Sequence, residues 1–219
     1  ALVTLTWLAS KTQTATLGTS VLVMPYLHPM VLAKEIATLD HLSGGRITLG
    51  LGVGSLPEEN DILGSDYQDR GHYSNEFIEV LLALWTQTEA NFAGKYWSFE
   101  NVVSSPKPLQ KPHPPIVIGG NRPPALRRVA KLGDGWHPLG LSPEKLSERM
   151  KFIQGEAESF GRSIDEFPVQ VRRDFDGINS ELIEAYAAAG VTDLVLSCNT
   201  SQVQEIENVL TSFAETFID

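Results

Sequence analysis

The stretch ATLGTSVLVMPYLHPMVLAKEIATLDHLSGGRITLGLGVG, residues 15–54, decides the fold. Its first nine residues are rich in Thr and Val and almost continuously apolar, which predicts a strand over 15–23 that is buried on both faces. A helix is predicted to begin at Pro29, because apolar residues follow at spacings of three and four, and the glycine pair at 44–45 ends it. Residues 47–52 then form a second strand. A strand, a helix and a strand in this order predict two parallel neighbours joined by a crossover helix.

The rest of the chain continues this alternation. Further helices are predicted over 77–85, 123–132, 142–160, 180–189 and 203–217, and further strands over 116–118, 135–137, 167–171 and 191–197. The aromatic and proline-rich segment 88–114 is predicted to be an excursion that returns to the sheet. Six strand–helix units result, and short units of this kind require a parallel sheet covered by helices.

The predicted fold is an α/β (β/α)₈ barrel with its first strand, helix and strand missing from the chain. A closed barrel needs eight units and about 250 residues. Ala1 opens directly onto Leu2, Leu5 and Leu8 at helical spacing, so we expect roughly 50 further residues upstream. The whole of 1–219 is then a single barrel domain that is incomplete at its N-terminus. An open doubly wound sheet is the rival fold.

Composition and charge exclude several classes of protein. Of the 219 residues, 42% are hydrophobic, which is too many for a disordered chain. Lys and Arg number 17 against 27 Asp and Glu, and the net charge of −10 repels the phosphates of nucleic acids. The most apolar region, 20–37, is interrupted by prolines and charged residues, so no membrane span is expected. The single cysteine excludes an internal disulfide, and a cytoplasmic location is expected.

Two glycine-rich strand ends are the most informative local motifs. Gly50, Gly52 and Gly54 have G-x-G-x-G spacing with no helix directly behind them, so the dinucleotide-binding fingerprint does not fit. They either turn the chain sharply or let a planar ring approach the backbone. Gly119 and Gly120 precede a helix, where free N–H groups and the helix dipole favour an anion such as phosphate, although a tight turn would use the same pair.

Titratable and nucleophilic residues give no catalytic assignment. The five histidines show no metal-binding spacing, so no metal site is expected. His137 alone falls at the carboxyl end of a predicted strand, where the chemistry of barrels takes place, although such a histidine is more often structural. Cys198 also ends a strand and is interpreted as a small buried hydrophobe. The motifs of serine hydrolases and P-loop NTPases are absent from the sequence.

Ordered motifs along the chain resemble those of the bacterial-luciferase-like oxidoreductases, which use flavin or the deazaflavin coenzyme F420. The motifs cover about two thirds of the chain, and they are specific together although each is weak alone. They are LGTSVLV (17–23), HP (28–29), AKEIATLD (33–40), LSGGR (42–46), GLGVG (50–54), LG (63–64), RG (70–71), PKP (106–108), HPP (113–115), IGG (118–120) and GDGW (133–136).

The resemblance implies a (β/α)₈ barrel that binds the cofactor ring at the carboxyl ends of its strands. In this family a non-prolyl cis peptide lies behind the ring, and the matching bond here joins Ser20 and Val21. The other cofactor-binding residues that the resemblance implies are Gly52, Val53 and Gly54 at the edge or side chain of the ring, and Gly119 and Gly120 at the phosphate.

Two departures from the family pattern bear on the activity. Members that use F420 to oxidise a sugar phosphate carry a glutamate where Ser55 stands, which argues against that chemistry. The family's polar residues at the end of strand two, often an Asp-His pair, would lie upstream of Ala1. The resemblance therefore leaves the catalytic residues unassigned.

The sequence favours an oxidoreductase that transfers a hydride between a small organic substrate and F420. The first alternative is a two-component monooxygenase that receives reduced FMN from a partner flavin reductase and inserts oxygen into its substrate. The second alternative is a non-catalytic flavin-binding protein. A homodimer is expected, because unpaired strand edges of an incomplete barrel invite pairing with another molecule.

Overall fold

The computed structural model describes residues 1–217 of the chain. The helices are α1 (Leu2–Lys11), α2 (Pro29–Ser43), α3 (Pro57–Leu63), α4 (Arg70–Thr86), α5 (Pro123–Leu132), α6 (Pro143–Ser159), α7 (Ser180–Ala188) and α8 (Val203–Phe217), with a 3-10 turn η1 (Met24–Tyr26). The strands are β1 (Leu17–Gly18), β2 (Leu22–Val23), β3 (Ile47–Gly52), β4 (Ala90–Ala93), β5 (Ser98–Val102), β6 (Ile116–Gly119), β7 (Gly135–His137), β8 (Gln170–Asp174) and β9 (Asp193–Ser197).

The parallel strands follow one another in chain order. Both β1 and β2 pair with β3, β3 pairs with β6, and β6 pairs with β7. Parallel bridges from Trp136 to Val169 and from Leu139 to Arg172 join β7 to β8, which pairs with β9. A doubly wound sheet reverses its strand order at a switch point, and this order never reverses. The predicted barrel-type α/β fold is confirmed, and the doubly wound alternative is wrong.

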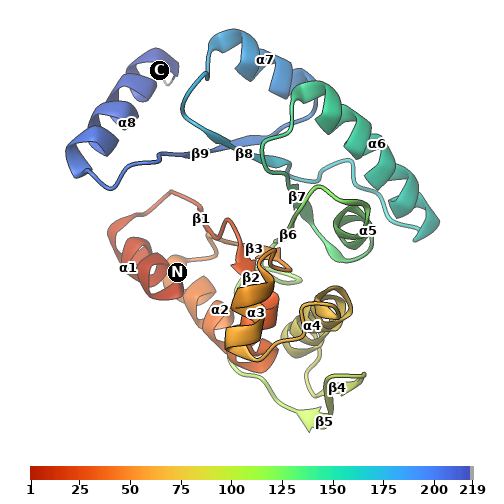
Figure 1. Ribbon diagram of the computed structural model, residues 1–219. Coiled ribbons are helices and arrows are strands. Elements are labelled where there is room, and N and C mark those ends of the chain that lie inside the picture. The colour runs from red at the N-terminus through yellow and green to blue at the C-terminus, as the bar shows by residue number, and fades with distance from the viewer. Residues whose placement is uncertain (218–219) are drawn as a thin grey trace.

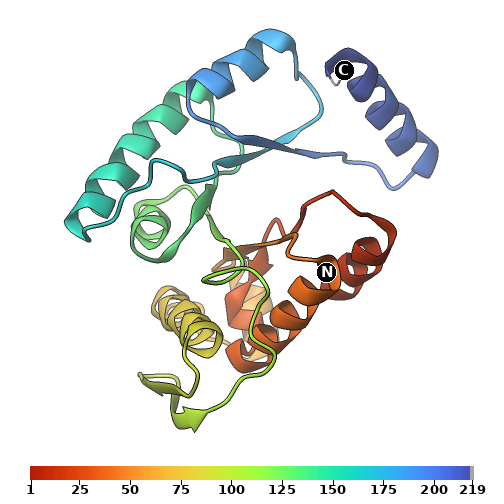
Figure 2. The same ribbon diagram turned by 180° about the vertical axis from the view of Figure 1, so that it is seen from behind.

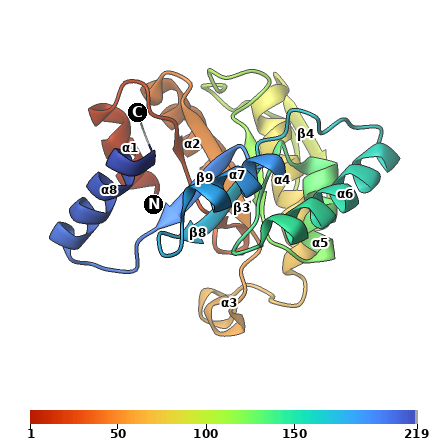
Figure 3. The same ribbon diagram turned by 90° about the horizontal axis from the view of Figure 1, so that it is seen from above.

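Four of the helices lie on the outer side of this curved row of strands. Figures 1 and 2 show α2, α4, α5 and α6 along that side, and Figure 3 shows the arrangement from above. Within residues 1–217, β1 and β9 end the row and do not pair with each other, so the strands form part of a barrel wall. None of the helices described is both long enough and apolar enough to cross a membrane.

One apolar core fills the space between the strands and the helices. The strands contribute side chains that are completely buried, and the inner faces of the helices cover them. The central members are Leu49, Leu51, Ile116 and Ile118 from the strands and Ile36, Phe77, Leu81, Leu126 and Val129 from the helices. Burial on both faces explains why the central strands are almost continuously apolar in the sequence.

Local signals account for the ends of α2. Pro29 occupies its first turn, where a missing N–H costs nothing, and Nδ1 of His28 accepts a hydrogen bond from the N–H of Met30 at 3.3 Å. Gly44 ends the helix in the left-handed region with a φ of 70°. The predicted helix from Pro29 and the predicted strand over 47–52 are both confirmed.

The structure differs from the predicted elements in several places. The strand predicted over 15–23 is broken into β1 and β2 by residues 19–21. The strand predicted over 167–171 begins later, at Gln170, because Pro168 has no N–H for the ladder. In addition, α4 begins at Arg70, seven residues before the helix predicted over 77–85, and the antiparallel pair β4–β5 forms within the excursion predicted over 88–114. No element is predicted where α3 forms.

Candidate functional site

The carboxyl ends of four parallel strands meet at one edge of the sheet. β2 ends at Val23, β3 at Gly52, β6 at Gly119 and β7 at His137. Because these strands are parallel, their carboxyl ends lie on the same side of the barrel wall. This is the side on which barrel enzymes carry out their chemistry.

The break between β1 and β2 packs into this edge. The peptide bond between Ser20 and Val21 is cis, as the resemblance implies. A Cβ atom on Gly52 would lie 2.6 Å from Cγ2 of Val21, and one on Gly119 would lie 3.2 and 3.3 Å from Cγ1 and Cγ2 of Val21. Val21 therefore fills the space that side chains on β3 and β6 would otherwise occupy.

The G-x-G-x-G motif has a structural explanation in the same break. A Cβ atom on Gly50 would overlap the carbonyl oxygen of Thr19, whose hydroxyl donates a hydrogen bond to the carbonyl of Gly50 at 2.8 Å. Gly54 has a φ of 77°, which favours glycine, and its Cβ would lie 2.9 Å from Cγ1 of Val23. The motif thus lets residues 19–23 approach β3 closely, which is not the geometry of a phosphate-binding loop.

Ser20 connects two side chains from distant strands. Its Oγ lies 2.9 Å from Nε2 of His137, and its carbonyl oxygen accepts a hydrogen bond from Nη1 of Arg172 at 3.4 Å. His137 is 6% exposed, and its buried Nδ1 has no hydrogen-bond partner among the residues that the structure describes. Burial lowers the pKa of His137, and the nearby charge of Arg172 lowers it further by a smaller amount, so the imidazole is neutral at neutral pH. The structure brings His137 to the site and adds Arg172 to it.

A second group of residues lines a cavity of ≈ 550 Å³ between α4 and α5. The lining includes Val53 together with the cationic side chains of Arg70, Arg122 and Arg128. Nε of Arg70 also donates a hydrogen bond to the carbonyl of Gly54 at 3.3 Å. The cavity therefore begins at residues predicted to contact the ring and continues to a cluster of guanidinium groups.

Arg128 is a buried cation that forms no ion pair in the described part of the chain. It is 5% exposed, and it donates hydrogen bonds to Oδ1 of Asn75 at 2.6 Å and to the carbonyl of Gly71 at 2.9 Å. Burial, followed by the charge of Arg70, lowers the pKa of Arg128 to about 10. None of the ion pairs within residues 1–217 includes Arg70, Arg122 or Arg128. A phosphate would give this cluster the counter-charge that it lacks.

The N-terminus of α5 offers fewer donors than the sequence suggested. The two prolines that open the helix have no N–H, and the N–H groups of Ala125 and Leu126 both donate to the carbonyl of Arg122 at 2.9 and 3.1 Å. The N–H of Gly120 donates to the carbonyl of His137 at 3.3 Å. Guanidinium groups, more than backbone N–H groups, are the donors available to an anion here.

Sequence reasoning missed Arg70, Arg128 and Arg172 as individual site residues. One signal was present for Arg70, since it is the first residue of α4, where the helix dipole disfavours a cation. A cation in that position requires another reason. Arg128 and Arg172 gave no such signal, because their roles depend on which faces of α5 and β8 turn toward the cavity and the strand ends.

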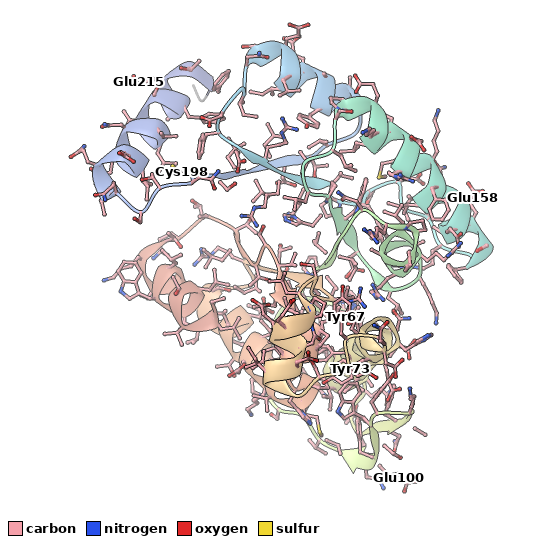
Figure 4. The ribbon with its side chains drawn as sticks, in the orientation of Figure 1. Tyr67, Tyr73, Glu100, Glu158, Cys198 and Glu215 are labelled. Atoms are coloured by element: carbon pink, nitrogen blue, oxygen red, sulfur yellow. The ribbon has the colours of Figure 1, made fainter. Side chains whose placement is uncertain are left out.

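Two other residues singled out in the sequence contact neither group. The carbonyl of Ser55 accepts a hydrogen bond from the hydroxyl of Tyr67 at 3.3 Å. Cys198, labelled in Figure 4, follows β9 and is partly buried. Over residues 1–217, no three His, Cys, Asp or Glu side chains are grouped so that they could hold a metal ion.

Comparison with known proteins gives the same fold and names a family. The family model described as luciferase-like monooxygenase matches residues 1–175. The chain is 32% identical over 139 residues to an FMNH2-dependent dimethylsulfone monooxygenase of Pseudomonas putida, covering 62% of this chain and 38% of that protein. It is also 32% identical over 157 residues to the oxygenase component of a flavin-dependent trigonelline monooxygenase of Acinetobacter baylyi, covering 70% of this chain and 43% of that protein.

Among solved structures, an F420-dependent secondary alcohol dehydrogenase superposes with a TM-score of 0.85. The alignment covers 100% of this chain and 84% of that one at 15% identity, so it supports the barrel fold alone. The chain spans less than half of the two monooxygenases named above. With a family match over most of its length and the strand order of a barrel, the chain belongs to the luciferase-like monooxygenase family, and the two relatives named above are flavin-dependent monooxygenases.

Proposed function

We propose that this chain is the cofactor-binding part of a two-component monooxygenase that uses reduced FMN on a small organic substrate. The observation that carries the proposal is the cationic cavity beside Val53, where the buried Arg128 forms no ion pair within residues 1–217. The sequence alone favours F420 as the cofactor. We propose FMN instead, because the two relatives of stated activity, each 32% identical to this chain, both depend on flavin. A flavin reductase is the partner that this proposal requires.

The residues of the site have separate tasks in this proposal. Val21 would support the ring from behind, since its side chain already stands between Gly52 and Gly119. Val53 and Gly54 would lie along the ring and its side chain, and Gly119 and Gly120 near the phosphate. Arg70, Arg122 and Arg128 would bind the phosphate through their guanidinium groups. Reduced flavin, when bound, supplies the electrons for the reaction with oxygen.

F420 is the second candidate cofactor, and one observation favours it. The cavity lining includes, beyond Arg128, Lys131 on α5 and Phe160 at the end of α6. F420 carries carboxylates beyond its phosphate, and they would suit the cationic end of the cavity. In that case the reaction is hydride transfer to or from the substrate.

Titration with FMN, riboflavin and F420, followed by ring fluorescence, tests the proposal. FMN and riboflavin differ only in the phosphate, so FMN is expected to bind at least about tenfold more tightly. Arg70→Met and Arg128→Met should abolish that difference, and Arg128→Lys should retain part of it. Arg149→Met, on α6 and outside the cavity lining, is the matched control and should change nothing.

The possible outcomes separate the candidates. Equal binding of FMN and riboflavin, or binding of neither, would overturn the proposal that this cavity holds a phosphate. Tighter binding of F420 than of FMN would replace the monooxygenase by the hydride-transfer enzyme. Tight binding of either cofactor without turnover by the full-length protein would point to a non-catalytic flavin-binding protein.

A further inference from the structure

Arg172 points across the mouth of the barrel. Val169 and Val171 are buried in the core, so the alternation of β8 turns Arg172 to the opposite face of the strand. Its guanidinium reaches the carbonyl of Ser20, which lies at the break between β1 and β2. A side chain that spans from β8 to the first strands lies over the carboxyl ends of the strands between them.

Arg172 has no negative partner at this position. The ion pairs formed within residues 1–217 do not include it, and its hydrogen bond to Ser20 is long at 3.4 Å. The carboxylate two residues away on the same strand, Asp174, accepts a hydrogen bond from Oγ of Ser197 at 2.6 Å instead. The guanidinium therefore keeps its planar set of donors for another group.

His137 lies beside the same serine. Its Nε2 lies 2.9 Å from Oγ of Ser20, while its Nδ1 is buried and has no partner. When the serine hydroxyl donates to Nε2, the proton of the neutral imidazole is on Nδ1, which then becomes a donor. The neutral imidazole therefore holds the Ser20 hydroxyl in place beside Arg172 and adds no positive charge of its own there.

These groups differ from those that would hold the cofactor phosphate. Arg70, Arg122 and Arg128 line the cavity between α4 and α5, and neither Arg172 nor His137 belongs to that lining. The chain thus carries two separate sets of anion-binding donors, one beside Val53 and one over Ser20. A single phosphorylated ring cofactor needs only the first set for its phosphate.

We propose that Arg172, with His137 and Ser20 beside it, binds a carboxylate group of the substrate at the mouth of the barrel. A carboxylate matches the planar guanidinium fork and accepts two parallel hydrogen bonds from it. The inference deepens the proposed function by naming the substrate class, and it rests on that function. The enzyme would act on small organic acids and discriminate against their uncharged analogues.

Calorimetric titration of the chain with benzoate and with benzamide, in the presence and absence of FMN, tests this inference. The two probes have similar shapes and differ in charge, so benzoate is expected to bind at least about tenfold more tightly. Arg172→Met should remove that preference, and Arg172→Lys should restore part of it. Arg173→Met is the matched control, because Arg173 is the next residue on β8 and lies on its other face.

Each outcome bears on one claim. An equal affinity for benzoate and benzamide, or a preference that survives Arg172→Met, would overturn the carboxylate subsite. Loss of FMN affinity in Arg172→Met as large as the loss of benzoate affinity would make Arg172 a cofactor-binding residue instead. Failure of the proposed function has a different signature, namely equal affinities for FMN and riboflavin with the benzoate preference intact.

Discussion

Val21 and Gly52 share one space, so substitutions at the two positions should compensate each other. Gly52→Ala would place a methyl group 2.6 Å from Cγ2 of Val21 and is expected to lower the free energy of unfolding by about 1–3 kcal/mol. Val21→Ala in the same chain should recover much of that loss, because the two residues are in direct contact. Urea unfolding of the two single variants and the double variant measures the coupling.

The matched control for this cycle is Gly155→Ala. Gly155 lies within α6 with nothing within 4 Å of an added Cβ, so alanine there should be neutral or stabilising through its higher helix propensity. A double variant whose destabilisation equals the sum of the two single losses would show that Val21 does not fill the space at Gly52.

His137 should make the stability of the chain depend on pH. Burial, and then the charge of Arg172, lowers its pKa in the folded state, so the folded chain binds this proton less readily than the unfolded chain does. The contribution of neutral His137 to the free energy of unfolding is complete above the pKa of about 6.5 that the residue has in the unfolded chain. That contribution is lost as the pH falls from there toward the lower pKa of His137 in the folded chain. His137→Gln should flatten that part of the profile. Melting temperatures of both proteins between about pH 7.5 and 5 provide the comparison, and parallel profiles would contradict it.

At the scale of elements, Arg46 attaches α1 to α2. Its Nη2 donates hydrogen bonds to the carbonyls of Ala9 and Thr12 at 3.1 and 3.0 Å, its Nη1 to the carbonyl of Ala15 at 2.5 Å, and its Nε to the carbonyl of Ser43 at 2.7 Å. The carbonyls at the end of α1 are those that a helix leaves without intrahelical partners. Arg46→Met is therefore expected to lower the free energy of unfolding by about 2 kcal/mol.

Hydrogen exchange locates this effect. The amides of α1 should exchange faster in Arg46→Met than in the unchanged protein, while those of α6 should not. Arg46→Lys, which keeps the charge but has fewer donors, should restore only part of the protection. Uniform acceleration across all helices would mean that Arg46 contributes to global stability and does not specifically hold α1.

The elements predicted correctly are those whose ends carry their own chemical signals. Pro29 and Gly44 mark the two ends of α2, and the apolar run that follows marks β3. No residue type in the sequence marks the break between β1 and β2, because a continuous strand and a broken one can have the same run of apolar residues. Only the family resemblance implied the cis bond between Ser20 and Val21. The need for glycine at position 52 follows from a tertiary contact, since Val21 occupies the space that a side chain there would fill.

Some candidate site residues can likewise be recognised in the sequence, and others cannot. Glycines at strand ends can be recognised in the sequence because a missing side chain is itself informative. Arg128 and Arg172 are ordinary residues in a helix and a strand until folding buries the first and turns the second across the strand ends. Neither forms an ion pair within residues 1–217, and that is a property of the folded chain.

At the scale of the whole molecule, four of the exposed large apolar side chains lie on α1 and α2, at one end of the strand row. Val3 and Trp7 are exposed one turn apart on α1. Val31 and Leu42 are exposed on α2, and their spacing of eleven residues places them on one face, three turns apart. Figure 1 shows α1 and α2 side by side at the β1 end of the row. Apolar surface of this kind is typical of an interface with another protein.

We therefore expect the chain to form a homodimer through this α1–α2 face. Trp7 is 60% exposed and Val31 is 56% exposed, so replacing both by glutamate should leave the fold intact while charging the interface. Sedimentation analysis should then show a dimer for the unchanged chain and a monomer for Trp7→Glu with Val31→Glu. Ile62→Glu, at a residue of α3 that is 83% exposed, is the control and should remain dimeric. If Leu210→Glu on α8 caused dissociation instead, the interface would lie at the β9 end of the strand row. Association would then be driven by the unpaired strand edge there and not by the α1–α2 face.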